Sequence, residues 1–79
     1  MTVVKAFGKA IKMRRVQLDL TQEDLANNAN MARSFVSGIE RGEKQATVQS
    51  VYRLALALRI MPSELWKTAE GIMNEETTT

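Results

Sequence analysis

The chain has 79 residues, of which 11 are basic and nine are acidic, and it contains no cysteine and no histidine. This composition excludes disulfide bonds, thiolate metal sites and imidazole catalysis, and no apolar run approaches the roughly 20 residues that span a bilayer. All 11 basic residues but only six of the acids lie in residues 1–67. We therefore expect one small domain whose basic body suits a polyanionic partner.

A first helix is predicted over residues 3–18 by apolar residues that recur at helical spacing. The stripe consists of Val4, Phe7, Ile11 and Leu18. Arg15 falls on the same stripe. Its charge needs a partner, because burying an unpaired charge is costly.

The next predicted helix runs to about Ala29. Thr21 is a suitable N-cap, and Asp24 lies three residues later, where the carboxylate of a capping box belongs. The small side chain of Ala26 is expected to let this helix cross closely with its neighbour. Asn30 enters the left-handed region more readily than most residues, so it can make a tight turn.

A third helix is predicted over residues 33–40. Val36 and Ile39 anchor it from the inside, and Gly42 suits the position after its end. Two short helices joined by a tight turn make a helix-turn-helix, and the second helix of such a unit lies in the major groove of DNA. Residues 21–42 therefore predict a DNA-binding element.

Two further helices complete the predicted domain. Thr47 caps the fourth helix, and Pro62 fits the first turn of the fifth. Their apolar positions are Val48, Val51, Leu54, Ala55 and Leu58 in the fourth helix and Leu65, Trp66, Ala69, Ile72 and Met73 in the fifth. The sequence thus predicts an all-α domain of five helices over residues 1–74, followed by a disordered acidic and polar tail over residues 75–79.

The runs LTQEDLA (residues 20–26) and IERG (residues 39–42) resemble the lambda-repressor-like, or Xre, family of DNA-binding domains. The resemblance covers about residues 4–70, and the run RSFVSGIERG is most similar to restriction–modification controller proteins. Family members pair a basic residue of the first helix with an acidic residue near the end of the third. The resemblance therefore implies a structural ion pair between Arg15 and Glu40. It also makes Gly38 a gap in the row of side chains that family members use on DNA.

The resemblance places the base-reading residues on the third helix. Arg33 opens this helix, and two guanidinium donors match the O6 and N7 acceptors of guanine; a phosphate contact is the alternative. Ser34 and Ser37 are expected to reach bases beside it. Phe35 has two open interpretations, which are contact with a thymine methyl group and packing at the protein surface.

Four residues are expected at the sugar–phosphate backbone. Gln22 lies at the start of the second predicted helix, where free backbone N–H groups favour an anion. The others, in and before the loop that follows the third helix, are Arg41, Lys44 and Gln45. For these three, an ordinary solvated loop is the alternative.

The resemblance also implies a two-fold homodimer through the fifth helix, with help from the fourth. The residues expected at the interface are Leu65, Trp66, Ala69 and Ile72. For Trp66, closing the core of a single chain is an equally open interpretation.

The predicted function is a cytoplasmic, sequence-specific transcriptional regulator that binds double-stranded DNA as a homodimer on a pseudo-palindromic operator. The resemblance implies control of its own promoter and of restriction–modification genes. An activator would also contact RNA polymerase, for which Glu23 and Asp24 are candidates, although acids there are ordinary helix-start residues. The alternative is an antitoxin or phage-type repressor that also binds a protein partner. We expect no enzymatic activity, cofactor, membrane contact or small-molecule substrate.

Overall fold

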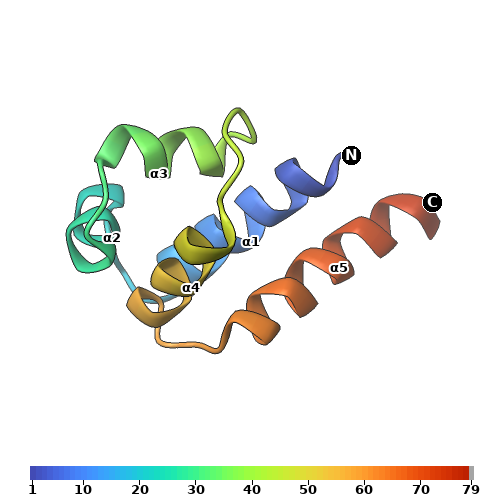
Figure 1. Cartoon of the computed structure of the whole chain (residues 1–79). Coiled ribbons are helices and arrows are strands. Elements are labelled where there is room, and N and C mark those ends of the chain that lie inside the picture. Colours follow the sequence, from blue (N-terminus) through green and yellow to red (C-terminus); the bar gives the residue numbers. More distant parts are fainter. Residues whose placement is uncertain (79) are drawn as a thin grey trace.

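In the computed structural model, the backbone is described for residues 1–78 and the side chains through residue 75. This part of the chain forms five helices and no strand (Figure 1). They are α1 (Val3–Gln17), α2 (Gln22–Ala29), α3 (Arg33–Glu40), α4 (Val48–Ala57) and α5 (Pro62–Thr78). The predicted all-α fold is therefore confirmed.

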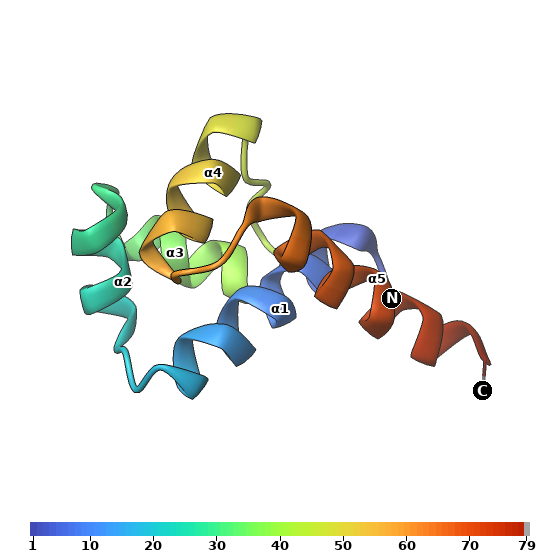
Figure 2. The ribbon, with the colours of Figure 1, turned by 90° about the horizontal axis from the view of Figure 1, so that it is seen from below.

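The helix α1 lies between α3 and α5 and packs against both, while α2 packs against α3 and α4 (Figures 1 and 2). All five helices contribute to one core. Its largest fully buried side chains are Ile11, Leu25, Val36, Ile39, Leu54, Leu58 and Leu65. This arrangement leaves the far side of α3 uncovered, along the upper edge of the molecule in Figure 1.

The local signals at α2 act as the sequence indicated. The Thr21 hydroxyl accepts a hydrogen bond from the Asp24 backbone N–H at 3.0 Å, and the Asp24 carboxylate accepts one from the Thr21 N–H at 3.0 Å. Asn30 ends the helix in the left-handed region, with φ 56° and ψ 53°. The capping box and the turn residue therefore set both ends of α2.

A close approach of α1 to α3 depends on Gly8, which the sequence did not single out. A Cβ atom at this position would lie 2.1 Å from the carbonyl oxygen of Ile39, a backbone atom that cannot rotate away. Ala26, the small residue expected at a close crossing, is also buried. Small residues thus bring α3 close to two neighbouring helices.

Arg14 joins α1 to the end of α4. Its Nε donates to the Leu58 carbonyl oxygen at 3.0 Å, and its Nη2 donates to that of Arg59 at 3.4 Å. Leu58 caps α4, and Arg59 follows in the left-handed region at φ 60°. Arg14 therefore satisfies carbonyl groups that the helix end leaves without a partner.

Three apolar residues of α4 and α5 have locations that the pattern alone did not give. Val48, an apolar position of the predicted fourth helix, has a side chain that is 90% exposed. Leu65 and Ala69, expected at a dimer interface, are 0% and 2% exposed and belong to the core of the single chain. They lie on the face of α5 that packs against α1, because a helix has only one stripe to bury in so small a domain.

The backbone of α5 continues to Thr78, past residue 74, where the predicted domain ended. The predicted tail over residues 75–79 falls mostly outside the residues whose side chains are described. Within the described part of the chain, no helix has the length and apolar character needed to cross a bilayer.

Candidate nucleic-acid interface

The outer face of α3 carries the polar side chains that the sequence singled out. With 3.6 residues per turn, Val36, Ile39 and Glu40 share the inner face and are buried. Arg33 and Ser34 are exposed, and Ser37 is half-buried on the same outer side. Arg33, Ser34 and Ser37 thus lie on the side of α3 that faces away from the core, where Arg41 reaches back to Ser37.

Phe35 has a different environment. Its ring is half-buried and packs against the hydrophobic core. This location favours the packing interpretation over contact with a thymine methyl group.

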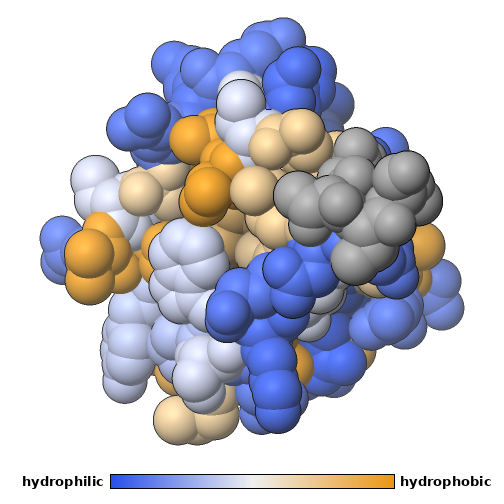
Figure 3. All heavy atoms as spheres, turned by 90° about the vertical axis from the view of Figure 1, so that its right-hand side faces the viewer, coloured by the Kyte–Doolittle hydropathy of each residue, from blue (hydrophilic) through white to orange (hydrophobic). Residues whose placement is uncertain are grey.

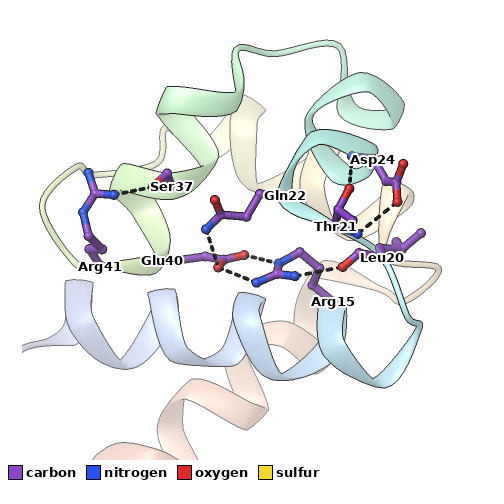
Figure 4. A network of polar contacts seen from close by, with 8 residues as sticks. All are labelled: Arg15, Leu20, Thr21, Gln22, Asp24, Ser37, Glu40 and Arg41. Carbon is purple, nitrogen blue, oxygen red and sulfur yellow. Dashed lines mark hydrogen bonds and ion pairs between the residues drawn. The ribbon is translucent and has the colours of Figure 1, made fainter.

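The pairing of Arg15 with Glu40 holds α3 against α1 (Figure 4). Arg15 Nε donates to Glu40 Oε2 at 2.7 Å, and Nη2 donates to Oε1 at 3.0 Å. Nη1 donates to the Leu20 carbonyl oxygen at 2.8 Å. The two side chains are only 13% and 3% exposed, so this is a buried, two-pronged pair. The hydrogen bond to Glu40 raises the pKa of Arg15, against the opposing effect of burial.

Gln22 joins this network from α2. Its Nε2 donates to Glu40 Oε1 at 3.0 Å, so one N–H of the amide is already in use and the second is free to donate elsewhere. Glu40 therefore contacts side chains from both α1 and α2 (Figure 4). The first residue of α2 is held in register with α3 by the same carboxylate that binds Arg15.

An open hollow of about 530 Å³ separates the start of α2 from the start of α3. It is lined by Arg15, Thr21, Gln22, Glu23, Asp24 and Arg33. Gln22, expected at a phosphate, and Arg33, expected at a base, thus face a common space. Hydrogen bonds from the Thr21 backbone and hydroxyl lower the pKa of Asp24 below its ordinary value, so this carboxylate is committed to the cap.

The loop after α3 packs back onto the helix. The backbone N–H groups of Glu43 and Lys44 both donate to the Gly38 carbonyl oxygen, at 2.9 and 3.2 Å. A Cβ at Gly38 would lie 2.7 Å from Lys44 Cγ, so the aliphatic stem of Lys44 covers this position. The sequence suggested that Gly38 leaves an open gap in the row of side chains on α3. In the structure the aliphatic stem of Lys44 fills this position instead.

Arg41 also turns back toward α3. Its Nη1 donates to the Ser37 hydroxyl, and its Nη2 lies 3.1 Å from Glu43 Oε1 (Figure 4). Gln45 is exposed in the same loop. The sequence did not single out Glu43; the only available signal was an acid inside an otherwise basic segment.

Apolar side chains remain exposed on α4 and α5. Val48, Tyr52 and Leu56 are 90%, 56% and 59% exposed and follow each other at intervals of four residues, which places them on one face of α4. A groove of about 220 Å³ joins this stripe to Trp66, which is 45% exposed. The centroids of the Trp66 and Phe7 rings lie 5.3 Å apart, so Trp66 packs against the core with one part and is exposed with the other.

A second groove, of about 180 Å³, opens between the start of α1 and Trp66. Figure 3 shows apolar surface gathered across the middle of the face on which the two chain ends lie, with hydrophilic side chains around it. The apolar surface thus lies beside the chain ends, and the second groove reaches the loop after α3, where Lys44 and Gln45 line it.

Comparison with known proteins agrees with this geometry. Residues 11–65 match the helix-turn-helix family, and the chain belongs to this family of lambda-repressor-like DNA-binding transcriptional regulators, which are not enzymes. The chain is 31% identical over 65 residues to control protein C.MunI of a Mycoplasma species, which covers 81% of this chain and 88% of that protein.

Two solved controller proteins have the same fold. The restriction–modification controller protein C.AhdI from Aeromonas hydrophila is 37% identical, with a TM-score of 0.77 over 78% of this chain and 94% of that one. C.Esp1396I, solved as a tetramer in complex with its natural 35 base-pair operator, is 27% identical, with a TM-score of 0.83 over 90% and 93% of the two chains. The similarity to controller proteins that the sequence indicated is thus confirmed.

Proposed function

We propose that this protein is a homodimeric transcriptional regulator that binds a pseudo-palindromic operator and controls its own promoter and those of restriction–modification genes. The observation that carries the proposal is the uncovered polar face of α3, which the buried pair of Arg15 and Glu40 fixes relative to the rest of the fold. The named relatives support the choice of regulated genes, since they are controller proteins.

In this proposal α3 lies in the major groove. Arg33 reads a guanine, and Ser34 and Ser37 contact neighbouring base edges. Gln22, through its second amide N–H, and the loop residues Lys44 and Gln45 contact phosphates on either side. Two contacts support this arrangement, because the Gln22–Glu40 hydrogen bond and the return of the loop onto the Gly38 carbonyl hold both groups against α3.

The second copy binds, in this proposal, on the apolar surface of α4 and α5. The stripe of Val48, Tyr52 and Leu56 with Trp66 is exposed in the single chain, which supports its use between two copies. Ile72, the remaining residue expected at the interface, is half-buried on α5 and packs against the core. Binding to one face of the DNA requires the two α3 helices of the dimer to lie about one helical turn apart, with half-sites at the same spacing.

Two finer roles also belong to the proposal. A contact with RNA polymerase would use Glu23, which is exposed, rather than Asp24, which is committed to the capping box. The regulator would work in the cytoplasm, together with its DNA. The antitoxin interpretation, in which the chain also binds a protein partner, predicts that the acidic chain end becomes ordered on that partner; most of residues 75–79 lie outside the described side chains.

Selection of binding sites from random DNA, followed by footprinting on the promoter of the protein's own gene, tests the proposal. We expect a two-fold symmetric site. Arg33→Ala should change the base preferred at one position of each half-site and lower operator affinity by about 5- to 150-fold, as the loss of a two-pronged guanine contact does. Equal loss on the selected site and on random DNA, or a winning site without symmetry, would contradict the model.

A further inference from the structure

The row of side chains on the outer face of α3 does not end with the helix. Arg33, Ser37 and Arg41 follow each other at intervals of four residues, and residues at this spacing are neighbours on a helix surface. Arg41 is the C-cap of α3 and keeps helical backbone angles, with φ −82° and ψ −6°. It therefore continues the row that begins with Arg33.

The side chain of Arg41 follows this row instead of extending into solvent. One of its terminal nitrogens donates to the Ser37 hydroxyl, and the other pairs with Glu43 at 3.1 Å. Figure 4 shows the guanidinium beside Ser37, at the same end of α3 as Glu40, whose carboxylate binds Gln22. The two partners thus hold the guanidinium over the outer face of the helix.

We propose that Arg41 is a second guanine-reading residue and that Glu43 positions it there, which keeps it off the phosphate backbone. The proposal deepens the assigned function and rests on it. Ser37 accepts from Arg41, so its own hydroxyl hydrogen remains to be donated, and the guanidinium itself offers only donors to the DNA. Guanine is the base that presents two acceptors in the major groove.

Glu43 also explains how the site rejects other sequences. Its carboxylate is 62% exposed and paired with Arg41, and it repels any phosphate that approaches without a base contact to compensate. An Arg41 that turned to a phosphate would leave this carboxylate unpaired. The carboxylate therefore weakens binding to random DNA more than binding to the operator.

The spacing makes the proposal specific. Arg33 and Arg41 are eight residues apart, which is about 12 Å along the helix axis at 1.5 Å per residue. With about 3.4 Å between base pairs, each half-site should contain two guanine-dependent positions roughly three base pairs apart.

The experiment measures the affinity of the full chain for a duplex carrying the selected site and for a random duplex of equal length, over a range of salt concentrations. Arg41→Lys keeps the charge but loses the two-pronged geometry. We expect it to lose about tenfold or more on the selected duplex and little on the random one, and repeated selection should lose one of the two guanines.

Glu43→Gln should raise affinity for the random duplex and lower the ratio of selected to random affinity by about two- to fivefold, the scale of an exposed ion pair. It should have no further effect on that ratio in the Arg41→Lys background. Glu70→Gln, which removes the same charge from an exposed position on α5, is the matched control and should leave the ratio unchanged.

Wild-type affinity of Arg41→Lys for both duplexes would overturn the inference. So would an Arg41→Ala variant that loses affinity equally on both duplexes and whose salt dependence falls by about one unit, as removal of a phosphate contact does. Failure of the proposed function is distinct, because then the unmodified protein would select no site at all. Because Arg41, Glu43 and Glu70 are exposed, their substitutions should leave the melting temperature unchanged.

Discussion

Among single residues, Glu40 shows how a charge is kept inside a small core. Its two oxygens accept from Arg15 and Gln22, and among the described residues no buried side-chain nitrogen or oxygen lacks a hydrogen-bond partner. Such a network is costly to break, because each remaining partner stays buried without compensation. The carboxylate therefore determines how α3 sits on α1 and α2.

Glu40→Gln should lower the free energy of unfolding by about 3 kcal/mol, because Arg15 would then be buried without a counter-charge. Chemical denaturation measures this. Glu43→Gln is the control, since the pair of Glu43 with Arg41 is exposed and should change stability by less than about 0.5 kcal/mol. Equal effects of the two substitutions would show that the Arg15–Glu40 pair is not buried in solution.

Two glycines give a matched test of the approach of α1 to α3. Gly8→Ala places a methyl group against the Ile39 carbonyl and should destabilise the fold by about 1–3 kcal/mol or more. Gly71→Ala, on α5 with no atom within 4 Å, should stabilise it by about 0.5–1 kcal/mol through helix propensity alone. Thermal melts of the two variants should shift in opposite directions; a shift of Gly8→Ala to higher temperature would exclude the tight crossing.

Among the helices, α2 has only eight residues and depends on its ends. Too short to be stable alone, it is fixed by the Thr21–Asp24 capping box, by Asn30, and by packing of Leu25 and Ala26. Its first turn faces the hollow shared with Arg33, so the cap also shapes part of the surface that we propose for DNA.

The capping box makes the stability of the protein depend on pH in acid. The pKa of Asp24 is lowered in the folded state, so its ionised form stabilises the fold above the ordinary value of 3.8. This contribution should fade as pH falls below 3.8 and vanish below the lowered pKa. The difference in melting temperature between wild type and Asp24→Asn should therefore be constant near neutral pH and should disappear in acid. A difference that persists at the lowest pH would argue against the assignment.

In the whole molecule, two surfaces of different chemistry are separated. The polar outer face of α3 suits DNA, whereas the apolar stripe of α4 with Trp66 suits a second copy of the chain. A domain of this size buries only roughly 60% of the surface exposed by its unfolded chain, so association would also stabilise it.

Tyr52→Glu should shift the protein toward a single 8.9 kDa species in sedimentation at micromolar concentration, because a charge would be desolvated between two apolar stripes. Its helix content should remain, since Tyr52 is 56% exposed in the single chain. Leu65→Ala is the contrasting variant: it should lose about 2–5 kcal/mol of stability, as a core residue does. Sedimentation of the wild-type protein as a monomer would contradict the dimer.

Lys44→Ala should weaken binding similarly on all sequences and reduce the salt slope by about one unit, if its ammonium group meets a phosphate. Gly38→Ala, which displaces the Lys44 stem, should have the same effect on DNA without removing the charge. Filter or fluorescence titrations at several salt concentrations separate this result from a change in sequence preference, which would assign Lys44 to a base instead.

The sequence by itself determined the features that depend on local chemistry. The capping box, the left-handed Asn30 and the helical stripes fixed the five helices, and the isolated charge of Arg15 on an apolar stripe required a partner. The outer position of Arg33 and Ser34 followed from the same periodicity, because each helix buries one stripe and exposes the other.

Only the tertiary structure decided which of several apolar or small residues meet. Leu65, Ala69 and Val48 are indistinguishable by periodicity, yet the first two are buried and the third is exposed. Gly8 and Gly38 acquire their roles from Ile39 and Lys44, which are distant in sequence or lie across a loop. Periodicity fixes the faces of one helix, but which face is covered depends on how the helices pack, and that is a property of the whole chain.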